Sequence, residues 1–109
     1  EISPQWRRSS REMADYRQLL DRFLKEQGHT MAEIRRHISA GEREEAMRLA
    51  HDLKGVAGLV GAKAVSAAAA RLERSLRGGA EEVSLAVLAA GCEAELSSLA
   101  AAVAATPQT

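Results

Sequence analysis

The sequence is poor in residues that cross-link a chain or interrupt a helix. It contains one cysteine, Cys92, so an internal disulfide is excluded and a small buried residue is expected at that position. Its two prolines, Pro4 and Pro107, lie near the ends, so no proline breaks a helix between them. Aromatic residues make up only 3% of the chain, so the core has to be built from aliphatic side chains and alanine. Because alanine is the strongest helix former, the composition favours an all-α fold.

An excess of charge of one sign is also absent. The chain has 15 basic and 15 acidic residues among 109, whereas a general nucleic-acid-binding protein needs a surplus of Lys and Arg. No cluster of Cys and His has the spacing of zinc ligands, and no charge-free apolar run is long enough to cross a membrane. We therefore expect no nucleic-acid partner, no bound metal ion and no direct membrane contact by this domain.

Apolar residues spaced three and four positions apart predict four helices. The first is expected to begin near Ser9 or Ser10, either of which would cap it, and to end before Gly41. The others are predicted at about residues 42–59, 62–76 and 80–104, with Gly61 ending the second helix and the pair Gly78 and Gly79 ending the third.

Short connections between these helices favour antiparallel neighbours. The predicted architecture is a single all-α domain, residues 1–109, folded as an antiparallel up-and-down four-helix bundle. The bundle covers about 11–105, after a lead-in of residues 1–10 and before a tail of residues 106–109.

The buried faces of the first two helices follow from the same spacing. In the first helix the predicted face comprises Met13, Tyr16, Leu19, Leu20, Phe23 and Leu24. In the second it comprises Ala46, Leu49, Leu53, Val56 and Val60. Gly28 interrupts the first pattern, which we still predict to be one continuous helix.

The stretch "LAHDLKGVAGLVGA", residues 49–62, places two glycines inside a helix that also carries His51 and Lys54. Each interior glycine costs about 1 kcal/mol relative to alanine. At about 100° per residue, His51, Gly55 and Gly58 share the face opposite the core, with Lys54 to one side. The glycines therefore leave an exposed imidazole unobstructed.

An exposed imidazole beside an ammonium group and bare backbone suits a phosphoryl group. A neutral imidazole nitrogen is a nucleophile, and the ammonium of Lys54 can offset negative charge on the product. The same residues also fit an ordinary surface histidine, with glycines that only let a neighbouring helix approach. Geometry alone leaves both interpretations open.

The wider pattern around His51 resembles the histidine-containing phosphotransfer (HPt) domain of bacterial multistep phosphorelays. The family pattern is His-x-Leu-Lys-Gly, a small residue, a further Gly, a Gly-Ala and, one helix later, Leu-Glu. It is matched by His51, Leu53, Lys54, Gly55, Ala57, Gly58, Gly61, Ala62, Leu72 and Glu73. The preceding segments "YRQLLDRFL" and "ISAGEREEAMRLAH" are similar too, so the likeness covers nearly the whole chain.

The resemblance implies that His51 accepts a phosphoryl group from the aspartate of a receiver domain and passes it to the aspartate of another. Lys54 is implied to stabilise phosphate charge, and Gly55 and Gly58 to make space. Mg²⁺ and most of the electrostatic stabilisation are expected in the receiver, so this chain would be a phosphocarrier without a cofactor or autonomous catalysis of its own.

Helix geometry adds receiver contacts at Met47 and Arg48, beside His51 on the same face. The part of the first helix near Ile34 and Ile38 is also expected to contribute to this contact.

Other ionisable residues have smaller expected roles. His29 and His37 are expected to be surface residues rather than phosphoacceptors. Glu73 is assigned a structural role, on a helix whose charged residues are expected to form a solvated face.

Three alternatives remain open. A histidine-kinase dimerisation domain also displays a histidine on a helical bundle, followed by an acidic residue, a position that Asp52 fills. Such a domain completes its bundle by dimerisation, whereas this chain has enough helices alone and is expected to be a monomer. A degenerate family member would bind partners without being phosphorylated, and a plain helical scaffold would not depend on His51. Because the chain begins with Glu1, we expect a piece of a longer protein, the cytoplasmic tail of an inner-membrane hybrid sensor kinase.

Overall fold

The computed structural model describes residues 5–105 as four α-helices, with side chains described from Arg11 onward. They are α1 (Gln5–Ser39), α2 (Arg43–Leu59), α3 (Lys63–Arg77) and α4 (Glu82–Ala105). No strand occurs in this part of the chain. The expected tail, residues 106–109, and the start of the expected lead-in, residues 1–4, lie outside the described residues.

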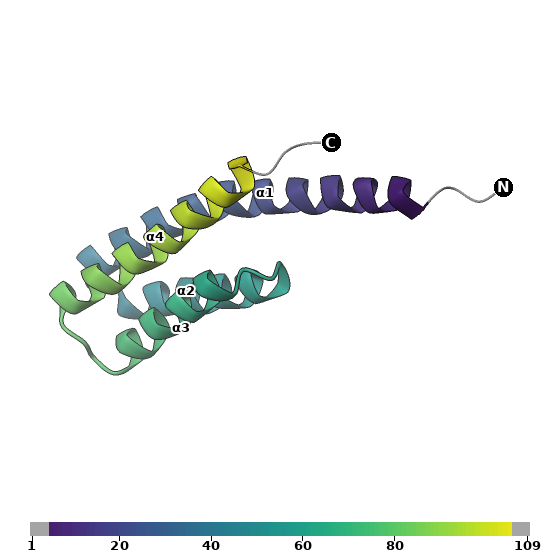
Figure 1. Cartoon of the computed structure of the whole chain (residues 1–109). Coiled ribbons are helices and arrows are strands. Elements are labelled where there is room, and N and C mark those ends of the chain that lie inside the picture. Colours follow the sequence, from purple (N-terminus) through teal and green to yellow (C-terminus); the bar gives the residue numbers. More distant parts are fainter. Residues whose placement is uncertain (1–4, 106–109) are drawn as a thin grey trace.

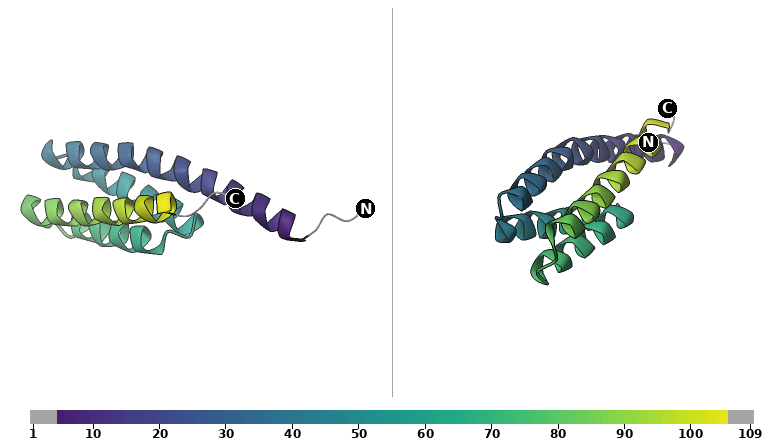
Figure 2. Two further views of the ribbon diagram at one scale, coloured as in Figure 1. Left: turned by 45° about the horizontal axis from the view of Figure 1, so that its top comes forward. Right: turned by 90° about the vertical axis from the view of Figure 1, so that its left-hand side faces the viewer.

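The helices form the antiparallel up-and-down bundle that the sequence predicts. Helix α1 packs against α2 and α4, and α3 packs against the same two helices. Consecutive helices reverse direction, so α2 and α3 make one hairpin, and α1 and α4 lie together beside it (Figure 1). Two further views show the same arrangement of neighbours (Figure 2).

Glycine ends each of the first three helices in the same way. Gly41, Gly61 and Gly79 have φ angles of 76°, 80° and 78°, where a residue with a Cβ is strained. At the α2–α3 turn, the N–H of Ala62 donates to the carbonyl of Ala57 at 2.8 Å, the bond that closes a Schellman motif. Bonds of the same spacing close the other two turns. The helix stops predicted at these glycines are therefore confirmed.

The buried face of α2 differs from the predicted one. Val56 is 37% exposed and Leu49 is only partly buried, whereas Ala50 and Ala57 are fully buried. The prediction followed the larger apolar side chains. In the structure the smaller ones face inward, because short side chains let neighbouring helices pack closely. Cys92 of α4 is buried in the same core, as expected.

Helix α1 begins earlier than predicted and extends past the α2–α3 hairpin (Figures 1 and 2). It starts at Gln5 rather than near Ser9 or Ser10. Its 35 residues span about 52 Å, against about 26 Å for the 17 residues of α2. The Tyr16 hydroxyl donates to the carbonyl of Val60 at 2.7 Å, which marks the level at which α1 passes the end of α2.

The predicted apolar stripe of α1 is buried only where the hairpin covers it. Leu20 and Phe23 are buried, whereas Met13, Tyr16 and Leu19 are 62%, 45% and 45% exposed. The spacing identifies the face of the helix correctly, but it does not say how far the partner helices reach. These three residues are therefore not part of the core.

Helix α4 is apolar enough, by length and composition alone, to cross a membrane. Core helices of soluble proteins pass the same test. Here α4 packs against α1 and α3 and buries Leu85, Ala89, Cys92, Leu96 and Val103. In this structure it is the fourth helix of the bundle.

Candidate functional site

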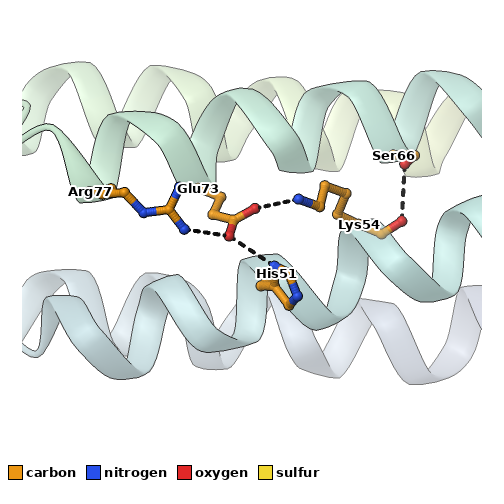
Figure 3. Close-up of polar contacts among 5 residues, drawn as sticks. All are labelled: His51, Lys54, Ser66, Glu73 and Arg77. Carbon is orange, nitrogen blue, oxygen red and sulfur yellow. Dashed lines mark hydrogen bonds and ion pairs between the residues drawn. The ribbon is translucent and has the colours of Figure 1, made fainter.

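His51 and the residues around it lie along the seam between α2 and α3 (Figure 3). Helix α2 supplies His51 and Lys54, and the antiparallel α3 supplies Ser66, Glu73 and Arg77. Because an α-helix repeats every 3.6 residues, the spacing of the last three puts them on one edge of α3, the edge that faces α2. The site is thus built across a single pair of helices.

The imidazole of His51 is exposed to solvent but held from the protein side. Its side chain is 62% exposed, and Nδ1 lies 2.9 Å from Oε2 of Glu73. An ionised carboxylate can only accept a hydrogen bond, so the proton is assigned to Nδ1 and the lone pair to Nε2. The nucleophilic nitrogen is therefore the one turned away from Glu73.

Glu73 is a buried carboxylate on which three side chains converge. Its own side chain is 5% exposed. The contacting atoms are Nζ of Lys54 at 2.8 Å from Oε1, and Nδ1 of His51 at 2.9 Å and Nη2 of Arg77 at 3.0 Å from Oε2. The hydrogen bond from Lys54 is the largest cause of a pKa of about 2 for Glu73, outweighing burial, and the bond from His51 acts in the same direction. Glu73 is consequently ionised at neutral pH.

Lys54 is attached to α3 at two points. Its ammonium contacts Glu73, and its backbone carbonyl accepts a hydrogen bond from Oγ of Ser66 at 3.0 Å. The Lys54 side chain is still 37% exposed, so the ammonium lies between the buried carboxylate and the solvent beside His51.

The two glycines of α2 have different surroundings. A Cβ on Gly55 would meet no atom within 4 Å, so this position leaves open space. A Cβ on Gly58 would lie 3.9 Å from Oγ of Ser66, an ordinary contact with α3. Both glycines are exposed, but only Gly58 lies close enough to α3 for an added Cβ to contact it.

The proposed partner contacts beside His51 are unequally placed. Arg48 is exposed, and its Nη2 lies 2.6 Å from Oε2 of Glu45 within α2. Met47 is partly buried and packs against the core. Ile34 and Ile38 are themselves buried, at 0% and 8% exposure, so their own side chains belong to the core, and a contribution from the surface of α1 near them stays a prediction.

The other histidines lie away from the seam. His29 is exposed on α1. His37 is partly buried near the α1–α2 turn, where its Nδ1 lies 2.8 Å from Oε1 of Glu42, so it is less exposed than predicted. Within the described residues, no group of three or more His, Cys, Asp or Glu side chains is placed to hold a metal ion.

The part that α3 plays in the site is not predicted by the sequence. The pattern of charges predicts a solvated face on this helix, but Glu73 is buried, and no role is assigned to Ser66 or Arg77. A signal for these residues exists, because their spacing puts them on one helix edge. This spacing indicates a role in the site only once that edge of α3 is known to face α2.

Among known protein families, the family model of the Hpt domain matches residues 18–106. No curated protein and no solved structure matches the chain. The matched range includes α2, α3, the seam between them and the part of α1 that the hairpin covers. The four-helix bundle and this match agree: the chain belongs to the Hpt domain family, which has a phosphotransfer role in phosphorelays.

Proposed function

We propose that this chain is a phosphorelay intermediate whose His51 accepts a phosphoryl group from one receiver-domain aspartate and transfers it to another. The observation that carries the proposal is the 2.9 Å contact between Nδ1 of His51 and Oε2 of Glu73. With the proton held on Nδ1, Nε2 keeps its lone pair on the exposed part of the ring. Hpt domains in general interact with receiver domains, which fits a nucleophile that faces solvent.

In the acceptance step, Nε2 of His51 attacks the phosphorus of the receiver's aspartyl phosphate. The N–P bond forms, the bond between phosphorus and the aspartate oxygen breaks, and the aspartate leaves as a carboxylate. No proton has to be removed, because Nδ1 keeps its hydrogen throughout. The positive charge that develops on the ring is offset by the ionised Glu73. Onward transfer reverses these bonds, with the second receiver's aspartate as the nucleophile.

Lys54 and Gly55 serve the phosphoryl group in different ways. The ammonium of Lys54 lies one helical turn from His51 and offsets the negative charge of the phosphoryl group. Gly55 leaves the space that a receiver's active site needs, with Gly58 beyond it. We place the Mg²⁺ of the reaction in the receiver, so this chain acts as a carrier.

The surface of α2 also suits contact with another protein. Val56 and Leu59 are 37% and 88% exposed, although both are large apolar residues. Apolar side chains left in water on the helix that carries the nucleophile are typical of an interaction surface. We assign this surface, with Arg48 and the exposed part of Met47, to receiver docking.

A histidine-kinase dimerisation domain explains the fold less well. Such a domain needs a second chain to complete four helices, whereas α1 to α4 complete a bundle within one chain. For the same reason we propose that the domain is a monomer. The hybrid-kinase context and the cytoplasmic location stay predictions from the sequence.

The proposal is tested by incubating the chain with a phosphorylated receiver domain and analysing it by mass spectrometry at neutral or alkaline pH, which preserves phosphohistidine. We expect one acid-labile phosphate on His51 and none on the His51→Gln variant. His29→Gln is the control, because His29 is exposed on α1 and its loss should leave acceptance intact.

Each other outcome has a defined meaning. Phosphate on a different residue would contradict the assignment of His51. Binding to several receivers without any phosphate would identify a non-phosphorylated binding module. If His51→Gln changed neither the binding of receivers nor the amount of phosphate on the chain, the chain would be a helical scaffold that does not depend on His51.

A further inference from the structure

Arg77 takes no part in the transfer step, yet it contacts the same carboxylate oxygen as His51. Its Nη2 lies 3.0 Å from Oε2 of Glu73, and its side chain is 64% exposed. Ion pairs between residues four apart on a helix are common and weak. This pair differs because its carboxylate is buried and is shared with Lys54 and His51. The role of Arg77 therefore depends on what happens to Glu73 when His51 is phosphorylated.

Lys54 faces two anions in the phosphorylated state. Before phosphorylation its Nζ lies 2.8 Å from Oε1 of Glu73. A phosphoryl group on Nε2 of His51 brings close to two negative charges to the exposed side of the seam. When the ammonium turns towards that group, Oε1 of Glu73 loses its cation. Loss of the positive partner of a buried carboxylate strongly destabilises the folded protein, because the negative charge is left uncompensated.

Arg77 is suited to take over this carboxylate. A guanidinium presents five N–H donors in a planar fork that matches both oxygens of a carboxylate. In the structure the described contact is between Nη2 and Oε2. Once Lys54 leaves Oε1, a second N–H of the same guanidinium can close on it and form a bidentate pair.

The balance of charge in the seam favours the same role. With His51 neutral, one negative charge on Glu73 is in contact with two permanent positive charges, on Lys54 and Arg77. A surplus of positive charge is therefore present before any phosphate arrives. Without Arg77, the ammonium of Lys54 would be the one permanent positive charge, among the described residues of the seam, available both to Glu73 and to the phosphoryl group, and it cannot contact both anions equally well.

We propose that Arg77 is a positioning residue, which holds Glu73 while Lys54 moves from that carboxylate to the phosphoryl group on His51. Arg77 acts through Glu73 and does not touch the phosphoryl group. The inference rests on the proposed function of His51 and adds to it a residue of α3 that controls where Lys54 is directed.

The test uses phosphoramidate, a small-molecule donor that phosphorylates exposed histidines without a receiver. The ³¹P signal of the phosphoryl group on His51, identified by its loss in His51→Gln, is titrated with pH. An ammonium beside the phosphoryl group favours its fully ionised form. If Lys54 stays on Glu73 in Arg77→Gln, the acid dissociation constant of the phosphoryl group should fall about threefold or more. The ¹⁵Nζ signal of Lys54 should shift on phosphorylation in the wild-type chain but not in this variant.

Three comparisons separate positioning from a general structural effect. Arg74→Gln removes an exposed arginine from the same helix and should leave the titration unchanged. Arg77→Lys keeps the positive charge but loses the planar fork, so it should restore only part of the wild-type dissociation constant. In a Glu73→Gln background no carboxylate holds Lys54, so Arg77→Gln should have no further effect. Far-UV circular dichroism establishes that each variant is folded.

Equal dissociation constants for Arg77→Gln and Arg74→Gln would overturn the proposal. An undiminished effect of Arg77→Gln in the Glu73→Gln background would also overturn it, because Arg77 would then act on the phosphoryl group itself. Failure of the proposed function has a different signature, in which His51 takes phosphate from phosphoramidate but from no receiver. A His51 that phosphoramidate leaves unmodified would overturn both.

Discussion

Glu73 connects an imidazole, an ammonium and a guanidinium through one carboxylate. Its charge, rather than its size, makes these contacts possible, because an amide in its place would present one oxygen and an N–H₂ group that donates. The carboxylate keeps the His51 proton on Nδ1 and directs Lys54 to the seam. At the scale of single residues, the ring nitrogen of His51 that we propose as the nucleophile is therefore set by a side chain on the neighbouring helix.

The lowered pKa of Glu73 makes the stability of the fold depend on acid pH. The ordinary pKa is 4.5 and the folded value is about 2, so the stabilisation is complete above about pH 4.5 and is lost as the pH falls through 2. The contribution is at most about 3 kcal/mol, and solvent around the partner side chains reduces it. In Glu73→Gln, the free energy of unfolding in urea should lose this acid-dependent component.

The control for this prediction is Glu45→Gln, which removes an exposed carboxylate paired with Arg48 within α2. It should leave the decrease in stability below pH 4.5 almost as it is in the wild-type chain. If the wild-type chain and Glu73→Gln lost stability in parallel over this range, Glu73 would not be the group responsible.

At the scale of the helix, Gly55 of α2 lowers the stability of the helix but leaves space for the proposed function. Gly55 lies inside the helix, where glycine is an unfavourable choice, and a Cβ there would meet no atom within 4 Å. The folded domain therefore does not need this glycine for packing. We attribute the cost of this glycine in helix stability to the open space that it leaves on the proposed docking surface.

Replacing Gly55 should separate these two properties. Gly55→Leu should raise the free energy of unfolding by about 0.5–1 kcal/mol, because leucine is the better helix former. Phosphoryl transfer from a receiver should slow at least about tenfold, the loss expected from an obstruction of only 1.4 kcal/mol. Urea unfolding and transfer kinetics measure the two effects.

Gly28→Leu is the matched control, since Gly28 lies inside α1 and a Cβ there also meets no atom within 4 Å. It should raise stability without slowing transfer. A lower free energy of unfolding for Gly55→Leu than for the wild-type chain would contradict the role given to Gly55. Phosphoryl transfer at the wild-type rate would also contradict it.

The four helices and the glycine stops between them were predictable because the signals are local, whereas the start of α1 was not. Glycine stops at Gly41 and Gly61 follow from the left-handed backbone that a Schellman motif requires, and Gly28 leaves α1 continuous, as predicted. The buried face of α2 was not fully predictable, because small residues such as Ala50 and Ala57 turn inward only against a close neighbour. The role of α3 in the site could not be predicted for the same reason, because it depends on which edge of α3 faces α2. His51, Lys54 and Gly55 could be singled out since they share one helix, whereas the contacts of His51 and Lys54 with α3 could not be predicted.

At the scale of the whole molecule, the bundle has a packed body and an α1 extension beyond it. Met13 and Met31 lie about five turns apart on the same face of α1, so they differ chiefly in what covers them. Met13 is 62% exposed, and Met31 is 1% exposed. This pair allows the limit of the core to be measured within one helix.

Truncating the two methionines should have very different costs. Met31→Ala should lower the free energy of unfolding by about 2–5 kcal/mol, through lost burial and the cavity left behind. Met13→Ala should change it by no more than about 0.5 kcal/mol. Chemical denaturation of both variants under the same conditions is the measurement. If the two variants lost similar amounts of unfolding free energy, Met13 would have to be buried in solution by contacts that this structure does not contain.

The seam described above also has a consequence for the order in which the protein folds. His51 and Glu73 are 22 residues apart in sequence, and the Ser66 bond to Lys54 spans 12. Closing a chain segment of this length carries a modest entropic cost, and contacts between near neighbours in sequence form quickly. The polar contacts of the site therefore belong to the part of the fold that can assemble first, from the α2–α3 hairpin. We expect substitutions in this seam to alter the folding rate, and those at the α1–α4 contact to act mainly on unfolding.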